Sequence, residues 1–213
     1  VIAIFLLILL TTINSKQSFG ISIFNLKKIK IENNLLLKDK DIKDLLIPFY
    51  NKNLIVLKNN EVKKALMRNS FVDSFEIKKK YPSTLKIKIF EKKPIAVLIN
   101  KKYKYYLSDK IDLIEFKNLP NYQTLPYIFG NEEDFEIFYK NLKKINFPFE
   151  KIKKYIFYET NRWDLETEDN KVIKLPSENY IKSLESYLNL KNKNGFEKYE
   201  LFDYRINNQL ILK

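Results

Sequence analysis

Three stretches in the first half of the chain alternate apolar residues with lysines. They cover residues 28–31, 75–80 and 85–89, and the last two are joined by the sequence Tyr81-Pro82-Ser83-Thr84. A period of two predicts strands that bury one face and expose the other, and the proline-containing tetrapeptide predicts a turn. We therefore expect one strand near residue 30 and a hairpin over residues 75–89.

The segments between these strands have a helical period instead. Over residues 41–49, apolar side chains recur at i, i+3, i+4 and i+7, which places them on one helical face. A second helix is predicted to follow a cap at Asn59 or Asn60 and to continue to about residue 66. The resulting order is β-α-α-β-β, so the two helices have to cover the one apolar face of the sheet while the lysines face water.

The second half of the chain combines short strands with two longer helices. Helical periodicity spans residues 131–145 and about 178–190. Asp169-Asn170 separates residues 162–167 from 171–175 and predicts a hairpin, because both residue types tolerate positive φ. Further strands are expected over residues 95–99, 103–107, 152–158, 198–205 and 209–213. The fold class is therefore α+β, with a small domain over residues 25–92 and a mixed β domain with two helices over residues 93–213.

The N-terminus begins with an uninterrupted apolar run over residues 1–10, VIAIFLLILL. A spanning helix needs about 20 such residues, and the core of a signal peptide about 7 to 15. The chain does not begin with methionine, and no small-x-small cleavage site follows the run. We interpret residues 1–13 as the C-terminal part of a transmembrane anchor and residues 14–24 as a juxtamembrane segment. A signal peptide and a buried strand of a soluble domain are the alternatives.

Missing residue types exclude several kinds of chemistry. The chain has no histidine and no cysteine, which rules out Ser-His-Asp and Cys-His nucleophile systems and zinc sites with nitrogen or sulfur ligands. Three glycines are too few for a Gly-rich phosphate loop. Ser83-Thr84-Leu85-Lys86 matches the S-x-x-K nucleophile motif, but it enters a predicted strand and no K-T-G or S-D-N partner motif is present. We expect no enzyme activity, no cofactor and no small-molecule substrate.

The formal net charge of +13 raises the question of nucleic acid. The lysines are spread along the whole chain, however, and neither a recognition helix nor the aromatic signature of an RNA-binding sheet is apparent. Lysine, isoleucine and asparagine are all abundant, which is typical of an AT-rich genome. A solvated basic surface is the better interpretation, and no nucleic-acid partner is expected.

Several short motifs carry a family resemblance. Residues 71–98 contain an aromatic-Pro turn, with Tyr81 where tryptophan is usual, an L-x-I-x-I strand, and E-x-x-P-x-A ending at Ala96. Later come L-P-x-x-x-G at residues 125–130, R-W-D-L at 162–165, V-x-K-L-P at 172–176 and D-Y-R at 203–205. In order and spacing these motifs resemble the FtsQ/DivIB family of bacterial cell-division proteins, especially its alphaproteobacterial type. The first domain resembles a POTRA module, which has the β-α-α-β-β order.

The resemblance implies a bitopic protein of the bacterial inner membrane, with a single span and the bulk of the chain in the periplasm. Such a protein is a scaffold for assembly of the division septum. Its expected partners are FtsB and FtsL-like proteins, with other divisome members as further candidates. The alternative is a POTRA-containing secretion or membrane-assembly factor, which would need a long C-terminal barrel.

The candidate binding site is the C-terminal strand. Because residues 209–213 form the last strand, at most one neighbour pairs with it inside the domain, and its open edge can accept a partner strand by β-augmentation. An inert, capped final strand is the competing interpretation. Only Arg68, Arg162 and Arg205 are arginines in this lysine-rich chain, and the resemblance makes Arg162 the better candidate for a partner carboxylate. The candidate partner-binding residues are Arg162, Arg205, Ile206, Asn207, Asn208, Gln209, Leu210, Ile211 and Leu212.

Overall fold

The computed structural model describes residues 22–191, 193–206 and 209–213, and the predicted anchor at residues 1–13 lies outside them. The chain divides into two compact units, the first ending at Lys92 and the second running from Lys93 to Lys213. Within the described residues, no helix is at once long enough and apolar enough to cross a membrane.

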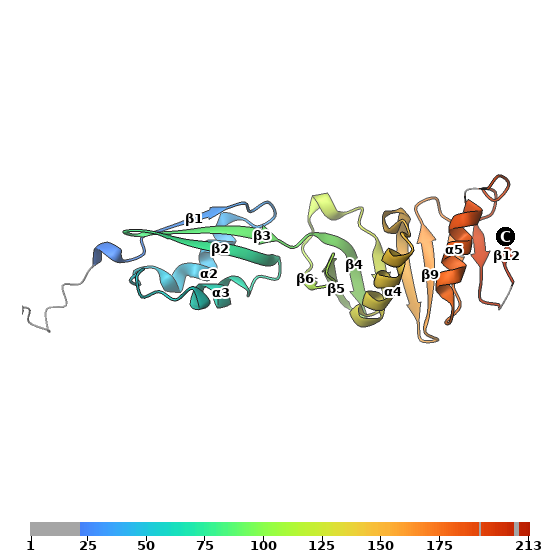
Figure 1. The fold of residues 1–213 in the computed structure, drawn as a ribbon, viewed down its shortest axis with the longest axis horizontal. Helices are drawn as coiled ribbons and strands as arrows, with labels where there is room; N and C mark the ends of the chain where they lie inside the picture. Colours follow the sequence, from blue (N-terminus) through green and yellow to red (C-terminus); the bar gives the residue numbers. More distant parts are fainter. Residues whose placement is uncertain (1–21, 192, 207–208) are drawn as a thin grey trace, which may run out of the picture. The chain divides into compact units, whose positions relative to one another are not determined.

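The first unit has the predicted β-α-α-β-β order (Figure 1). The central strand β3 pairs with β1 in parallel and with β2 in antiparallel orientation. Its elements are η1 (Ser22–Phe24), β1 (Lys28–Glu32), α2 (Asp39–Leu46), η2 (Ile47–Phe49), α3 (Asn59–Leu66), β2 (Val72–Lys80) and β3 (Thr84–Glu91).

The predicted apolar face forms the core of this unit. Leu85, Ile87 and Ile89 of β3 are fully buried. The facing side chains of α2 and α3 are buried as well, and they include Ile42, Leu46, Val62 and Leu66. Burying an aliphatic side chain of this kind contributes roughly 1.5–3 kcal/mol, so the alternating pattern stabilises the unit directly.

The helix ends differ from the sequence prediction. Asn59 is the first residue of α3, and the N-cap is Lys58, which makes no capping hydrogen bond through its side chain. The predicted asparagine cap is therefore wrong. The helix expected over residues 41–49 also changes to a 3-10 turn at Ile47, because proline at position 48 cannot donate the next helical hydrogen bond.

Glu91 of the E-x-x-P-x-A motif has a structural role. Its carboxylate accepts hydrogen bonds from three successive backbone N–H groups in the connection from β1 to α2, those of Leu35, Leu36 and Leu37, at 3.1, 2.8 and 2.9 Å. One side chain thereby ties the end of β3 to the connection that leads into α2.

The second unit is built on one nine-stranded sheet with the order β12-β11-β10-β9-β8-β7-β4-β5-β6. Its first elements are β4 (Pro94–Asn100), β5 (Tyr103–Ser108), β6 (Leu113–Glu115), η3 (Pro120–Tyr122), β7 (Tyr127–Phe129), α4 (Glu132–Lys144) and η4 (Phe149–Lys151). The remaining elements are β8 (Ile152–Tyr158), β9 (Arg162–Thr167), β10 (Val172–Lys174), α5 (Tyr180–Lys191), β11 (Leu201–Asp203) and β12 (Ile211–Leu212).

Both predicted helices of this unit pack on one face of the sheet (Figure 1). Phe135 and Phe138 of α4 surround Trp163 of β9, and the Phe138 and Trp163 rings are stacked with centroids 4.8 Å apart. Trp163 is only 5% exposed, so it belongs to the core. From α5, Leu184 and Tyr187 complete the same core.

Gly130 of the L-P-x-x-x-G motif lies against this aromatic cluster. A Cβ atom at this position would stand 3.0 Å from Cβ of Phe157 and 3.6 Å from the Trp163 ring. Glycine is therefore favoured here by close approach, because a Cβ would fit only if Phe157 moved by a few tenths of an ångström.

Asparagine takes the role that glycine has in most turns. Among the described residues, eight non-glycine residues have positive φ, and six of them are asparagines. Asn170 has φ of 59° and closes the β9–β10 hairpin, as predicted from the Asp169-Asn170 pair. Asn161 does the same between β8 and β9 with φ of 56°. Asparagine tolerates this conformation better than other residues with a side chain, so a chain with three glycines can still turn sharply.

The final strands are shorter than predicted. The segment expected over residues 198–205 is a strand only at Leu201–Asp203, and the one expected over 209–213 only at Ile211–Leu212. Strand β11 ends where the Asp203 carboxylate accepts a hydrogen bond from the backbone N–H of Arg205, at 3.1 Å. Such an aspartate turn competes with continued strand pairing.

Candidate functional site

The sheet of the second unit has two open edges, β12 and β6. Strand β12 pairs only with β11, in antiparallel register, with Leu212 opposite Phe202 and Ile211 opposite Asp203. The predicted edge position of the last strand is therefore observed, over two residues.

Backbone direction along β12 follows from its hydrogen bonds. Lys213 and Leu201 exchange both of their backbone hydrogen bonds, at 3.2 and 3.0 Å. In an antiparallel ladder the next residue points its N–H and C=O the other way. The N–H and C=O of Leu212 therefore point away from β11, toward the open side of the sheet.

A groove lies next to this edge, between the start of α5 and the C-terminal segment. It has a volume of about 350 Å³ and is lined by residues that include Lys182, Ser186, Tyr204, Ile206 and Leu210. Burial raises the pKa of the Tyr204 hydroxyl, and nearby Ser186 opposes that shift in part. Polar side chains of the α5 region therefore line the groove together with Tyr204, Ile206 and Leu210.

The face of the sheet opposite α4 and α5 carries a charged row. The register places Asp164 of β9 beside Lys174 of β10, and Lys174 beside Asp203 of β11. Ile211 of β12 is the next member of the row. Asp164 and Asp203 are only 4% and 6% exposed, so their neighbours cover both carboxylates. This charged row leads from the centre of the sheet to its open edge.

Arg205 is fixed against the charged row. Its Nε and Nη2 donate to the two carboxylate oxygens of Asp203, at 2.8 and 2.6 Å. This bidentate pair lowers the pKa of Asp203. The Arg205 side chain is still 38% exposed, so part of the guanidinium faces solvent next to β12. The ion pair that the spacing of the two residues suggests is therefore formed.

Arg162 does not lie on the edge itself. It is on β9, which β10 and β11 separate from β12. Its guanidinium packs over the ring of Tyr158, with Cζ 4.6 Å from the centroid. The buried Nε of Arg162 has no hydrogen-bond partner among the described residues. Arg162 precedes Asp164 on β9 and Arg205 follows Asp203 after the end of β11, so both arginines lie near the same end of the charged row.

The sequence gives no sign that Asp164 is buried. Burial raises the pKa of this carboxyl, while the charges of Arg162, Lys174 and Arg205 and a hydrogen bond from Tyr158 oppose the shift. Its Oδ1 has no hydrogen-bond partner within the described part of the chain. In an alternating strand, an aspartate between Trp163 and Leu165 is predicted to face solvent. The residues that cover it are found only from the pairing register of the neighbouring strands.

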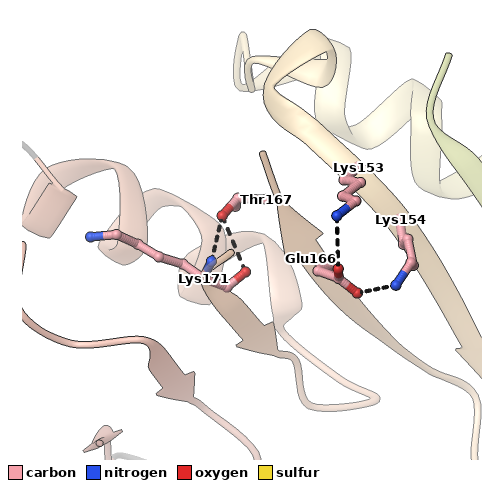
Figure 2. Close-up of polar contacts among 5 residues, drawn as sticks. All are labelled: Lys153, Lys154, Glu166, Thr167 and Lys171. Atoms are coloured by element: carbon pink, nitrogen blue, oxygen red, sulfur yellow. Dashed lines mark hydrogen bonds and ion pairs between the residues drawn. The ribbon is translucent and has the colours of Figure 1, made fainter. Parts of the chain in front are cut away.

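A second ion cluster lies on strands β8 and β9 (Figure 2). Glu166 of β9 pairs with Lys154 at 2.7 Å and with Lys153 at 3.8 Å. Two successive lysines reach one carboxylate because the β8–β9 register shifts between Ile152 and Lys154. In the adjacent turn, Thr167 Oγ1 accepts a hydrogen bond from the Lys171 N–H and donates one to its carbonyl, at 2.9 and 3.1 Å. These contacts hold the hairpin and offset part of the lysine charge, so we assign them a structural role.

The structure describes all the candidate binding residues except Asn207 and Asn208, which lie outside the described residues. Arg205, Ile206, Gln209 and Leu210 surround the edge or the groove, and Ile211 and Leu212 form β12. The exposed fractions of Ile206 and Ile211 are 49% and 45%, which is high for large apolar side chains. In the described part of the chain, no group of three or more acidic side chains is placed to hold a metal ion.

Comparison with known proteins finds similarity to one family of proteins along most of the chain. A family model for the FtsQ-type POTRA domain matches residues 24–92. The cell division protein FtsQ of Rickettsia conorii is 25% identical over 195 residues, which cover 89% of this chain and 72% of that protein. The chain is thus similar to the FtsQ-type POTRA domain over residues 24–92 and to FtsQ proteins over most of its length.

Other FtsQ proteins show the same similarity. FtsQ of Rickettsia bellii is 26% identical over 195 residues, covering 89% of this chain and 72% of that protein. FtsQ of Geotalea daltonii is 31% identical over 108 residues, or 51% of this chain and 38% of that protein. All of these relatives are cell division proteins.

Proposed function

We propose that the chain is a bitopic divisome scaffold of the inner membrane, and that it binds FtsB–FtsL by adding a partner strand to the open edge of β12. The observation that carries the proposal is the edge itself: β12 has one neighbour, and the N–H and C=O of Leu212 point outward. A row of unpaired backbone groups is the template that β-augmentation uses.

Backbone groups alone do not select a partner, and the surroundings of β12 supply the selectivity. On one side, the groove beside α5 accepts apolar side chains against Ile206 and Leu210. On the other side, Arg205 offers the exposed part of its guanidinium. A partner strand flanked by a large apolar residue and a carboxylate fits both features.

Arg162 is proposed to contact the partner away from the edge. Its Nε is buried without a partner, which costs about 1–3 kcal/mol for such a group. An incoming carboxylate on the face of the charged row would relieve that cost. Because β10 lies between β9 and β11, the two arginines would meet different carboxylates of the partner. Ile206 to Leu212, including Asn207 and Asn208, complete the proposed contact.

The domain assignment belongs to the same proposal. Residues 1–13 would be the end of a transmembrane anchor, 14–24 a juxtamembrane segment, 25–92 the POTRA-like domain and 93–213 the partner-binding β domain. The anchor proposal is supported by the apolar run at residues 1–10, and the single-span topology would place both domains in the periplasm.

A capture experiment tests the proposal. The full chain in detergent is immobilised and exposed to the FtsB–FtsL pair from the same organism, and a chain ending at Ile206 is treated in parallel. Loss of capture by the shortened chain is expected, because β12 and the end of the groove are gone. A circular-dichroism melt checks that the shortened chain still folds. Undiminished capture by a folded shortened chain contradicts the edge as the binding site.

A further inference from the structure

One end of the first unit gathers three segments that are far apart in the sequence: residues 22–28, 51–58 and 78–84. The N–H of Leu54 donates to the Phe24 carbonyl at 2.8 Å, and the N–H of Lys27 donates to the Ser83 carbonyl at 2.9 Å. Nζ of Lys79 donates to the carbonyls of Ile55 and Leu57, at 3.4 and 2.5 Å. We refer to these three segments as the basic end.

The charged residues of the basic end are all positive. Its 22 residues include seven lysines and no aspartate or glutamate; the lysines are Lys27, Lys28, Lys52, Lys58, Lys78, Lys79 and Lys80. Two acids from outside reach it: Glu61 of α3 pairs with Lys52 at 3.6 Å, and a hydrogen bond from Lys86 together with the charge of Lys80 lowers the pKa of Glu32 on β1. The chain as a whole has 39 basic and 26 acidic residues. Three neighbouring segments with seven lysines and no acid of their own therefore form a local concentration of positive charge.

Large apolar side chains project between these lysines. The exposed fractions of Ile23, Ile55, Val56 and Tyr81 are 59%, 49%, 72% and 56%. The Tyr81 ring also lies edge-on against Phe24, with centroids 5.9 Å apart. Exposed apolar groups among lysines form the combination that inserts into the boundary between lipid headgroups and acyl chains.

We propose that the basic end docks on the surface of an anionic lipid bilayer. The inference rests on the proposed membrane anchor at residues 1–13. Eight residues, 14–21, separate that anchor from Ser22, and they span at most about 28 Å. Ser22 itself belongs to the basic end, so the tether holds this end, and not the opposite one, close to the headgroups.

A second copy of the chain does not suit the basic end, because seven lysines on each copy would repel. An anionic bilayer offers both complements at once, negative headgroups for the lysines and an apolar layer below them for Val56, Ile55 and Tyr81. Each lysine near an anionic membrane surface contributes about a fivefold preference for the bound state. An acidic protein surface would satisfy the lysines but not the four apolar side chains.

The absence of cysteine from the chain makes the test direct. The full chain carrying Val56→Cys is labelled with a fluorophore and reconstituted into nanodiscs of phosphatidylglycerol and phosphatidylcholine that contain a lipid with an acyl-chain quencher. The matched control is Leu35→Cys, which is 90% exposed and lies near Glu91, beyond the opposite ends of β1 and β3. Quenching at position 56 but not at 35 is expected, and it should fall at least tenfold in pure phosphatidylcholine.

Two variants with the same net charge distinguish the effect of lysines in the basic end from the effect of the total charge of the chain. In the Val56→Cys background, Lys27→Gln/Lys58→Gln/Lys80→Gln should lower the ratio of docked to undocked label about 100-fold. Replacing three exposed lysines elsewhere in the unit, Lys40→Gln/Lys63→Gln/Lys64→Gln, should change it less than threefold.

Two results overturn the inference, and they differ from each other. If the chain enters nanodiscs but the label at position 56 behaves like the label at 35, docking is wrong while the anchor stands, and the basic end faces water or an acidic protein. If the chain does not enter nanodiscs at all, the proposed anchor fails and the inference falls with it.

Discussion

Replacing Leu212 by proline removes one outward-pointing N–H from the proposed docking edge. The internal ladder does not use this group, because Lys213 and Leu201 make the neighbouring pair of hydrogen bonds. Leu212→Ala is the matched control, since it removes the same side chain and keeps the N–H. The difference between the two variants therefore reports on the backbone group and on the proline ring that replaces it.

The expected loss of affinity follows from the small number of hydrogen bonds that this edge can make with a partner strand. By alternation, Leu210 and Leu212 present their N–H and C=O outward, which allows four backbone hydrogen bonds to a partner strand. Each is worth about 0.5–1.5 kcal/mol net, and the proline ring also occupies the position of the incoming strand. We expect Leu212→Pro to bind FtsB–FtsL at least tenfold more weakly than Leu212→Ala.

Isothermal titration calorimetry with both variants measures this difference. Leu113→Pro, on the opposite edge strand β6, is a second control, because the hydrogen bond from Ser108 N–H to the Asp112 carbonyl implies that Leu113 N–H also points outward. It should bind as the unmodified chain does. Equal affinities of Leu212→Pro and Leu212→Ala would refute strand addition at β12, even if the shortened chain fails to bind.

Two further predictions concern the second unit itself. Gly130→Ala should destabilise the second unit by about 1–3 kcal/mol, because the new Cβ meets Cβ of Phe157 at 3.0 Å. A thermal melt should show a midpoint lower by several degrees. An unchanged melt contradicts the close packing of β7 on β8. Asp164→Asn should gain stability relative to the unmodified chain as pH rises from about 4 to 7. Burial raises the pKa of Asp164, so the unmodified chain loses stability as pH rises through that pKa and the carboxyl ionises, whereas the asparagine variant does not. Urea titrations at the two pH values measure the change, and a difference between the chains that is independent of pH would show that folding does not raise the pKa of Asp164.

Local patterns predicted the elements whose partners lie next to them in the chain. The β2–β3 hairpin around Tyr81-Pro82 and the β9–β10 hairpin around Asn170 are both antiparallel, so alternation and turn residues suffice. The short strands β6 and β7 were not predicted. In β7, three residues pair in parallel with β4 and β8, and such distant pairing leaves no periodic signal in so short a segment.

Only part of the candidate site was predictable, because only contacts between residues close in the sequence leave a local pattern. Arg205 and Asp203 are two residues apart, and that spacing alone puts them on one face. The distance of Arg162 from the edge depends on the order of strands in the sheet, which the order along the chain does not determine. Helix α5 carries the chain from β10 to the parallel strand β11, so the sheet gains two strands beyond β10 before it ends.

If a partner strand pairs with the outward N–H and C=O of Leu212, as proposed, that pairing has a consequence for how this protein and its partner can diverge. A strand that docks through its main chain is accepted whatever side chains it carries at the paired positions. Mutations can therefore accumulate on both sides of such a contact without breaking it, and only the few flanking positions, such as Arg205 and the groove beside α5, have to change together. Inhibitors that copy a strand backbone should accordingly act across distant members of the family, whereas those that copy side chains should not.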